Sequence, residues 1–151
     1  MRRFFQTHCS GSTFAFTLNA PCSGNASAAE RAALLSQAHD AVCREQSAEC
    51  LAVVILPDRI DAIWTSADGA ALRERQRSLE AAFTAELKVL EALDPRCKTK
   101  LRARHIRGKA DLQRHVDTCH FAPVRHGWTR EPEDWPHSTI HHMAPSDMIL
   151  T

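Results

Sequence analysis

Basic side chains gather in one short segment of this chain of 151 residues. Residues 96–109 contain seven Lys and Arg side chains and no Asp or Glu. The first five alternate with other residues, so on a β-strand they would point to one side of the sheet. Such a stripe neutralises phosphate groups and is typical of proteins that bind nucleic acids in a salt-dependent way. The candidate binding residues are Arg96, Lys98, Lys100, Arg102, Arg104, Arg107 and Lys109, followed further along the chain by Arg125 and His126.

The net charge of the whole chain is only +1, because acidic residues elsewhere offset this basic segment. Residues 96–130 hold ten Lys and Arg side chains against two Asp. A basic run also occurs as a solvated face with acidic neighbours, so charge alone leaves both interpretations open.

Residues 115–138 read HVDTCHFAPVRHGWTREPEDWPHS and closely resemble the signature tail of REP-associated tyrosine transposases. The tail of that family typically reads HVDYIHxNPVKHGLVxRPxDWPxSS. Two further segments, Val53–Thr65 (VVILPDRIDAIWT) and Leu101–Asp111 (LRARHIRGKAD), resemble the family's VVLPDHMHCIWT and FWEHxIRDxAD. The shared tail residues are His115, Val116, Asp117, His120, Pro123, Val124, His126, Gly127, Arg130, Pro132, Asp134, Trp135, Pro136 and Ser138.

The resemblance implies a catalytic site whose residues are substituted here. In the family, two His on a strand converge on a divalent metal such as Mg²⁺ or Mn²⁺, and a Tyr on a facing helix attacks DNA. The corresponding positions hold Arg59, Asp61 and Thr118, and the whole sequence contains no Tyr. Arg stays protonated and offers no lone pair to a metal. An aliphatic alcohol is far less acidic than a phenol, whose pKa is near 10. We therefore expect no catalytic residue, no metal site and no cofactor.

The resulting hypothesis is a transposase-family protein that binds single-stranded or hairpin DNA and no longer cleaves it. Two alternatives remain open. The first is a residual metal-dependent DNA nuclease that uses Asp61 with a different nucleophile or an activated water. The second is a decayed relic kept as a folded interaction module, with a homodimer as one possibility.

The elements that must position these residues follow the order β-α-β-β-α-β-α. This order predicts an α+β fold, a ferredoxin-like antiparallel sheet with helices on one face, and the resemblance implies the same fold. The predicted strands span residues 13–18, 51–56, 60–65 and about 96–107. The predicted helices span residues 27–46 and 69–94, with a third from about 110 that Pro123 stops. Their predicted buried faces contain Leu35, Ala38 and Val42; Leu72, Leu79, Phe83, Leu87 and Leu90; and Leu112, Val116 and Cys119.

We expect one domain over residues 1–151, with a tail from about residue 123 attached to the core by Trp135. No apolar run approaches the roughly 20 residues that a membrane span needs. The segment after Arg2 and Arg3 is too polar for a secretory signal, and the six Cys lack a C-x-x-C pair. These features predict a cytoplasmic protein with reduced cysteines and no membrane partner.

Overall fold

The computed structural model describes residues 12–19, 27–45, 49–66, 69–91 and 99–142. The predicted order of strands and helices is confirmed, and the described part of the tail adds two short 3-10 helices. The elements are β1 (Ser12–Asn19), α2 (Ala28–Glu45), β2 (Glu49–Leu56), β3 (Arg59–Ser66), α3 (Gly69–Glu91), β4 (Lys100–His105), α4 (Lys109–Arg125), η1 (Pro132–Asp134) and η2 (Thr139–His142).

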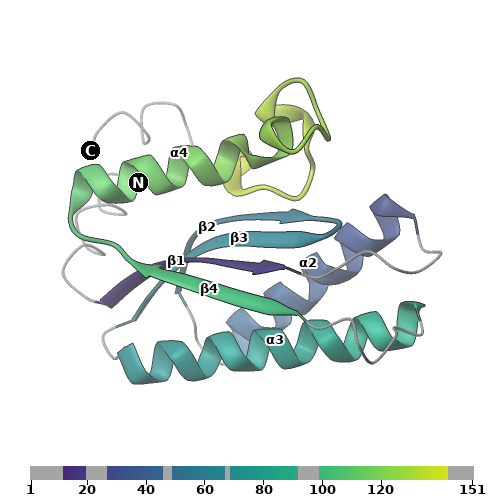
Figure 1. Cartoon of the computed structure of the whole chain (residues 1–151), viewed down its shortest axis with the longest axis horizontal. Coiled ribbons are helices and arrows are strands. Elements are labelled where there is room, and N and C mark those ends of the chain that lie inside the picture. Colours follow the sequence, from purple (N-terminus) through teal and green to yellow (C-terminus); the bar gives the residue numbers. More distant parts are fainter. Residues whose placement is uncertain (1–11, 20–26, 46–48, 67–68, 92–98, 143–151) are drawn as a thin grey trace.

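The four strands form one sheet in the order β2-β3-β1-β4, and every neighbouring pair is antiparallel. Strands β1 and β2 both run against β3, so they are parallel to each other with β3 between them. Strands β3 and β4 are related in the same way through β1. Two interleaved split β-α-β units of this kind make a ferredoxin-like sheet. The predicted α+β fold is therefore confirmed (Figure 1).

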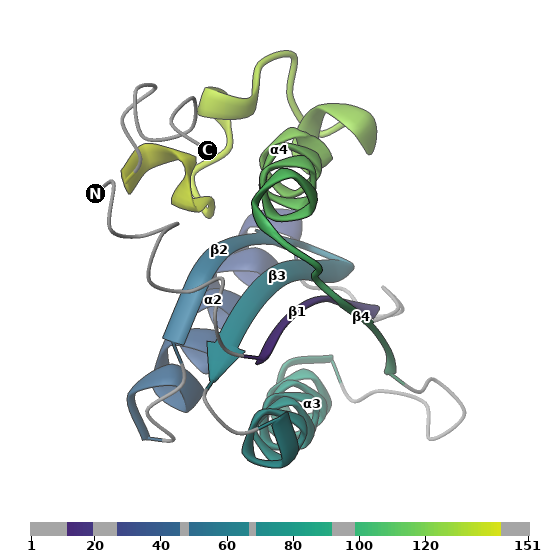
Figure 2. The ribbon, with the colours of Figure 1, turned by 90° about the vertical axis from the view of Figure 1, so that its left-hand side faces the viewer.

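The helices cover both faces of this sheet, which differs from the expectation of a single covered face. Figures 1 and 2 show α2 and α3 on one face, as the ferredoxin-like order predicts, and α4 on the other. The physical reason lies in β3, whose six central residues, 60–65, are all buried. A strand whose residues are buried on both sides lies between two packed layers, with helices over each face.

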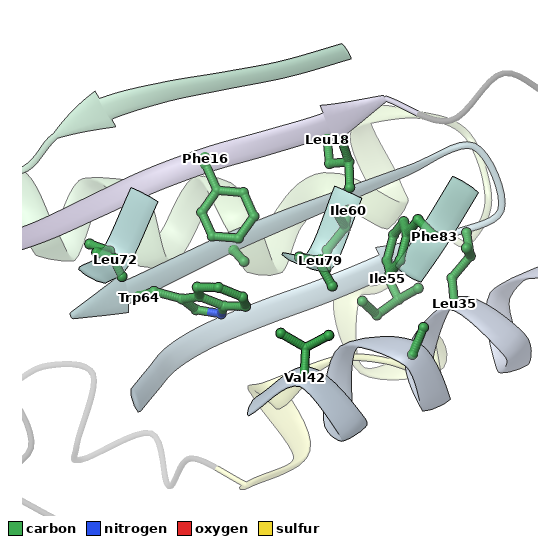
Figure 3. Close-up of a cluster of buried hydrophobic side chains, with 12 residues drawn as sticks. Phe16, Leu18, Leu35, Val42, Ile55, Ile60, Trp64, Leu72, Leu79 and Phe83 are labelled. Carbon is green, nitrogen blue, oxygen red and sulfur yellow. The ribbon is translucent and has the colours of Figure 1, made fainter. Parts of the chain in front are cut away.

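The face under α2 and α3 holds a hydrophobic core of aliphatic and aromatic side chains (Figure 3). Phe16 and Trp64 meet edge to face with ring centroids 4.9 Å apart. The indole Nε1 of Trp64 donates to Nε2 of buried His39 at 3.1 Å, so the buried donor has a partner. Leu35, Ala38, Val42, Leu72, Leu79 and Phe83 are buried there as predicted, whereas the side chains of Leu87 and Leu90 lie outside the described residues.

The opposite face is covered by α4 through Leu112, Val116 and Cys119, which are buried as predicted. Pro123 does not stop this helix; it lies inside the last turn, and α4 continues to Arg125. The helix ends where Gly127 adopts φ +79°, a backbone conformation that glycine tolerates. There the amide of Trp128 donates to the Pro123 carbonyl at 2.8 Å and that of Gly127 to the Val124 carbonyl at 3.0 Å, a Schellman arrangement.

The tail lies along the outer edge of β2. The amide of Ile55 donates to the His137 carbonyl at 2.9 Å, and the amide of Val53 donates to Oγ1 of Thr139 at 3.0 Å. Trp135 is 9% exposed, and its indole donates to the Ile55 carbonyl at 2.7 Å. Trp135 therefore attaches the tail as expected, and the tail covers an edge strand that would otherwise present unpaired amides. Within the described residues no helix is long and apolar enough to cross a membrane.

His120 forms a second link between α4 and the tail. Its Nε2 lies 2.9 Å from Oγ1 of Thr139, and the side chain is buried. Burial lowers the pKa of His120 to about 4, so the folded state holds it neutral.

We expect Trp135→Ala to lower the free energy of unfolding by about 3–5 kcal/mol, because it empties a buried site and leaves the Ile55 carbonyl without its donor. Trp128, whose ring lies 5.9 Å from that of Trp135 and which is 39% exposed, provides the matched control. Urea unfolding of both variants checks this. Equal losses in the two would contradict the assigned role of Trp135.

The neutral His120 predicts a stability that depends on pH. Its folded pKa is lower than the unfolded value of about 6.5, so the unfolded state binds the proton more tightly. The contribution of neutral His120 to the free energy of unfolding is fully present above pH 6.5 and is lost as the pH falls towards 4. Between pH 7.5 and pH 5 the wild type should lose about 2 kcal/mol more than His120→Gln does, measured by urea unfolding. Parallel losses would show that another group titrates.

Candidate functional site

A pocket of about 440 Å³ lies between the sheet and α4. Strands β1, β3 and β4 form its floor, and α4 forms its wall. Its size falls within the roughly 300–1,000 Å³ of small-ligand sites. The polar side chains that line it belong to Thr17, Arg59, Asp61, Arg102, Arg104, His115, Thr118 and Arg125.

Strand register places the floor residues in rows. Thr17 of β1 pairs with Asp61 of β3 on one side and with Arg102 of β4 on the other. Asn19 likewise lies between Arg59 and Lys100. Directly paired residues point to the same face of a sheet, so β4 presents its cations on the same side as Arg59 and Asp61.

Asp61 is the centre of the floor. One carboxylate oxygen, Oδ1, accepts a hydrogen bond from Oγ1 of Thr17 at 2.7 Å and lies 3.5 Å from Nη2 of Arg59. The side chain of Asp61 is 12% exposed and that of Arg59 is 22% exposed. The second oxygen of Asp61 and Nε of Arg59 are buried and have no hydrogen-bond partner among the described residues.

The wall carries Thr118 and His115, which lie one helical turn apart on α4. Oγ1 of Thr118 donates to the Arg114 carbonyl of its own helix at 2.9 Å. Nδ1 of His115 lies 2.8 Å from the Asp111 carbonyl, which fixes the proton on that nitrogen. His120 contacts the tail, so of the two histidines near Thr118 in the sequence only His115 lines the pocket.

The expected meeting of Arg59, Asp61 and Thr118 is observed, since all three line the pocket. Among the candidate cations, Arg102, Arg104 and Arg125 also line it, and Lys100 is exposed beside Arg102 on β4. The remaining candidates fall elsewhere: His126 is exposed just after α4, Arg107 and Lys109 are exposed near its first turn and do not line the pocket, and Arg96 and Lys98 lie outside the described residues.

Two titratable side chains near the pocket, His126 and Cys119, have shifted pKa values. Partial burial, followed by the positive charges of Arg59 and Arg125, lowers the pKa of His126. Burial raises the pKa of Cys119 well above its usual value, and its thiol donates to the Asp61 carbonyl at 3.2 Å. Cys119 is therefore a packing residue and not a nucleophile.

The described residues do not suit a divalent metal. No group of three or more His, Cys, Asp or Glu side chains comes together in that part of the chain. Among the residues that the structure describes, Asp61 is the one carboxylate that lines the pocket, and a guanidinium lies beside it. An arginine within 4 Å places a permanent positive charge where a cation would have to bind.

Sequence reasoning missed two residues of the site. Thr17 bonds Asp61, and Arg114 lines an adjoining pocket of about 490 Å³ together with Arg104, Asp111, His115 and Thr118. The alternation of side chains along β1 places Thr17 on the face of the sheet opposite to that of its aromatic neighbours. Only the register with β3 shows that its partner is Asp61. Arg114 is separated by one turn from Thr118 on α4, and that spacing could have identified it.

Comparison with known proteins places the chain in a family. No family model matches it. It is 30% identical over 142 residues to the REP-associated tyrosine transposase of Escherichia coli K12, which covers 93% of this chain and 84% of that protein. The solved structure of a REP-associated tyrosine transposase bound to a REP hairpin matches with a TM-score of 0.69 and 30% identity, over 87% of this chain and 78% of that one. This chain belongs to the family of REP-associated tyrosine transposases.

Proposed function

We propose that this chain is a DNA-binding member of the transposase family that does not cleave DNA through a tyrosine. The observation that carries the proposal is the pocket, where Arg59, Asp61 and Thr118 stand at the positions that the family resemblance assigns to metal ligands and nucleophile. The structural relative holds a REP hairpin. Single-stranded or hairpin DNA is accordingly the proposed partner.

Loss of the nucleophile is supported by the chemistry at Thr118. The sequence contains no Tyr that could replace it. The Thr118 hydroxyl donates to a carbonyl of its own helix, and His115 donates from Nδ1 to another. The hydroxyl proton of Thr118 is therefore directed to a carbonyl and not to the unprotonated Nε2 of His115, and an alcohol whose proton no base removes is a weak nucleophile.

Retained DNA binding is supported by exposed cations. Lys100, Arg102 and Arg104 alternate along β4 and have no acidic partner among the described residues. Unpaired cations on an edge strand attract phosphates, and their release of bound counterions makes the affinity depend on salt.

A residual metal-dependent nuclease is a second candidate. One observation favours it: Oδ2 of Asp61 is buried without a hydrogen-bond partner among the described residues, as a ligand awaiting a cation would be. Metal-dependent nicking would separate this candidate from the first. A folded module that binds no DNA, alone or as a homodimer, is the third, and it predicts no salt-dependent binding.

We expect no covalent protein–DNA adduct when the chain is incubated with a single-stranded hairpin and Mg²⁺ or Mn²⁺, because neither the nucleophile nor the metal ligands are in place. Denaturing electrophoresis of a labelled hairpin measures both adducts and nicks. An adduct that disappears in Thr118→Ala would contradict the proposal. Nicks without an adduct, lost in Asp61→Ala, would favour the nuclease.

Replacing Lys100, Arg102 and Arg104 together with Gln should weaken hairpin binding strongly. Each lost phosphate contact removes about 0.7–0.9 from the slope of log affinity against log salt, so the magnitude of the slope should fall by roughly two to three. The matched control replaces exposed Arg44, Arg73 and Arg77 on α2 and α3 with Gln, which changes the net charge equally on the other face of the sheet.

Fluorescence anisotropy at several salt concentrations measures both triple variants. Equal behaviour of the two would show that β4 does not contact DNA and that any binding depends on net charge or on residues elsewhere.

A further inference from the structure

The charges that line the pocket are mostly positive. Four arginines and one aspartate supply them, which gives a formal charge of +3. Arg59 makes an ion pair with Asp61, whereas Arg102, Arg104 and Arg125 have no acidic partner in the part of the chain that is described. A concave site with this balance favours an anion over a cation.

Arg59 has hydrogen-bonding capacity left over. A guanidinium carries five N–H donors in a planar fork. The contact with Asp61 uses Nη2 at 3.5 Å, a distance typical of an ion pair rather than of a short hydrogen bond, and Nε is buried without a partner among the described residues. A buried donor without an acceptor costs free energy, so a ligand oxygen that reaches it is favoured.

We propose that this pocket binds the backbone phosphates of a DNA strand directly through guanidinium groups, without a divalent ion. Arg59, whose side chain is 22% exposed, is the central donor, with Arg102 on the strand side and Arg125 on the helix side. Asp61 is a positioning residue that holds Arg59 against the floor. This inference rests on the proposed DNA-binding function and deepens it, because it names the group of the DNA that is recognised and the residues that recognise it.

The adjoining pocket extends the site along α4. It shares Arg104, His115 and Thr118 with the first pocket and adds Arg114 and Asp111. From Asp111 to Arg125 the helix axis rises about 21 Å, several times the 3.4 Å between nucleotides in one strand of B-form DNA. A strand with several phosphates, rather than a single anion, matches this length.

The first arm of the test compares Arg59→Gln with the wild type for binding of a single-stranded hairpin in EDTA. We expect wild-type binding to persist in EDTA and Arg59→Gln to bind about tenfold more weakly, because a charge-assisted hydrogen bond is lost. Arg77→Gln, an exposed arginine of α3, is the matched control and should bind like the wild type.

The second arm uses Asp61→Asn, for which a phosphate site and a metal site predict opposite signs. Asn can still accept from Thr17, while removal of the negative charge makes the pocket more positive. Binding in EDTA should tighten several-fold if phosphates occupy the pocket. If Asp61 instead ligates a metal, the variant should lose an affinity that only Mg²⁺ or Mn²⁺ supports. Thermal unfolding checks that both variants fold. If Asp61→Asn does not fold, the comparison of Arg59→Gln with the wild type decides alone between a phosphate site and a metal site.

A small probe keeps this inference separable from DNA binding as a whole. Thymidine 3′,5′-bisphosphate in EDTA should shift the backbone amide resonances of Arg59 and Thr118 in the wild type but not in Arg59→Gln. That result supports the pocket even if the hairpin is not bound, which would defeat the proposed function alone. Hairpin binding that requires a metal, or that is equal in Arg59→Gln and Arg77→Gln, overturns the inference and leaves DNA binding intact. Absence of any shift with the bisphosphate also overturns it.

Discussion

The structure depends on the register of β3 between β1 and β2. Alternation along β3 sends Ile60, Ala62 and Trp64 into the core under α2 and α3, and sends Asp61 and Ile63 towards α4. A slip of one residue would exchange the two faces and place Arg59 and Asp61 in that hydrophobic core. The cost of burying those charges without partners excludes registers that are shifted by an odd number of residues.

This register also explains why a pocket exists beside α4. The helix packs its apolar residues, among them Leu112 and Val116, over β2 and β3, where Val54 and Ile63 are buried. Over β1 the floor consists of small side chains, Ala15 and Thr17, and over β4 it consists of exposed arginines. Small and charged residues do not fill the space under a helix, so a cavity remains on that side.

Much of the fold could be predicted because its signals are local. The predicted start of α2 at residue 27 depends on Ser27, whose Oγ accepts from the Glu30 amide at 3.1 Å. The apolar periodicities likewise depend only on neighbouring residues. The face covered by α4 could not be predicted, since no local pattern states on which side a third helix lies. Nor could the pair Thr17–Asp61, which spans 44 positions. The prediction that Pro123 stops α4 was wrong because a proline in the last turn removes a single hydrogen bond of the helix. Gly127 determines where α4 ends.

In the proposed function, an arginine at residue 59 would separate two tasks that an active metal centre performs together. A cation near a phosphate both attracts it and draws electron density from the scissile bond. A guanidinium also attracts the phosphate strongly, but it spreads its charge over several atoms. It binds oxygen atoms through N–H hydrogen bonds and has no coordination position to offer. With Asp61 beside it, Arg59 carries a partly compensated charge. In the proposed function this contact serves binding, because interaction energy that is gained equally in the ground state and in the transition state does not accelerate a reaction.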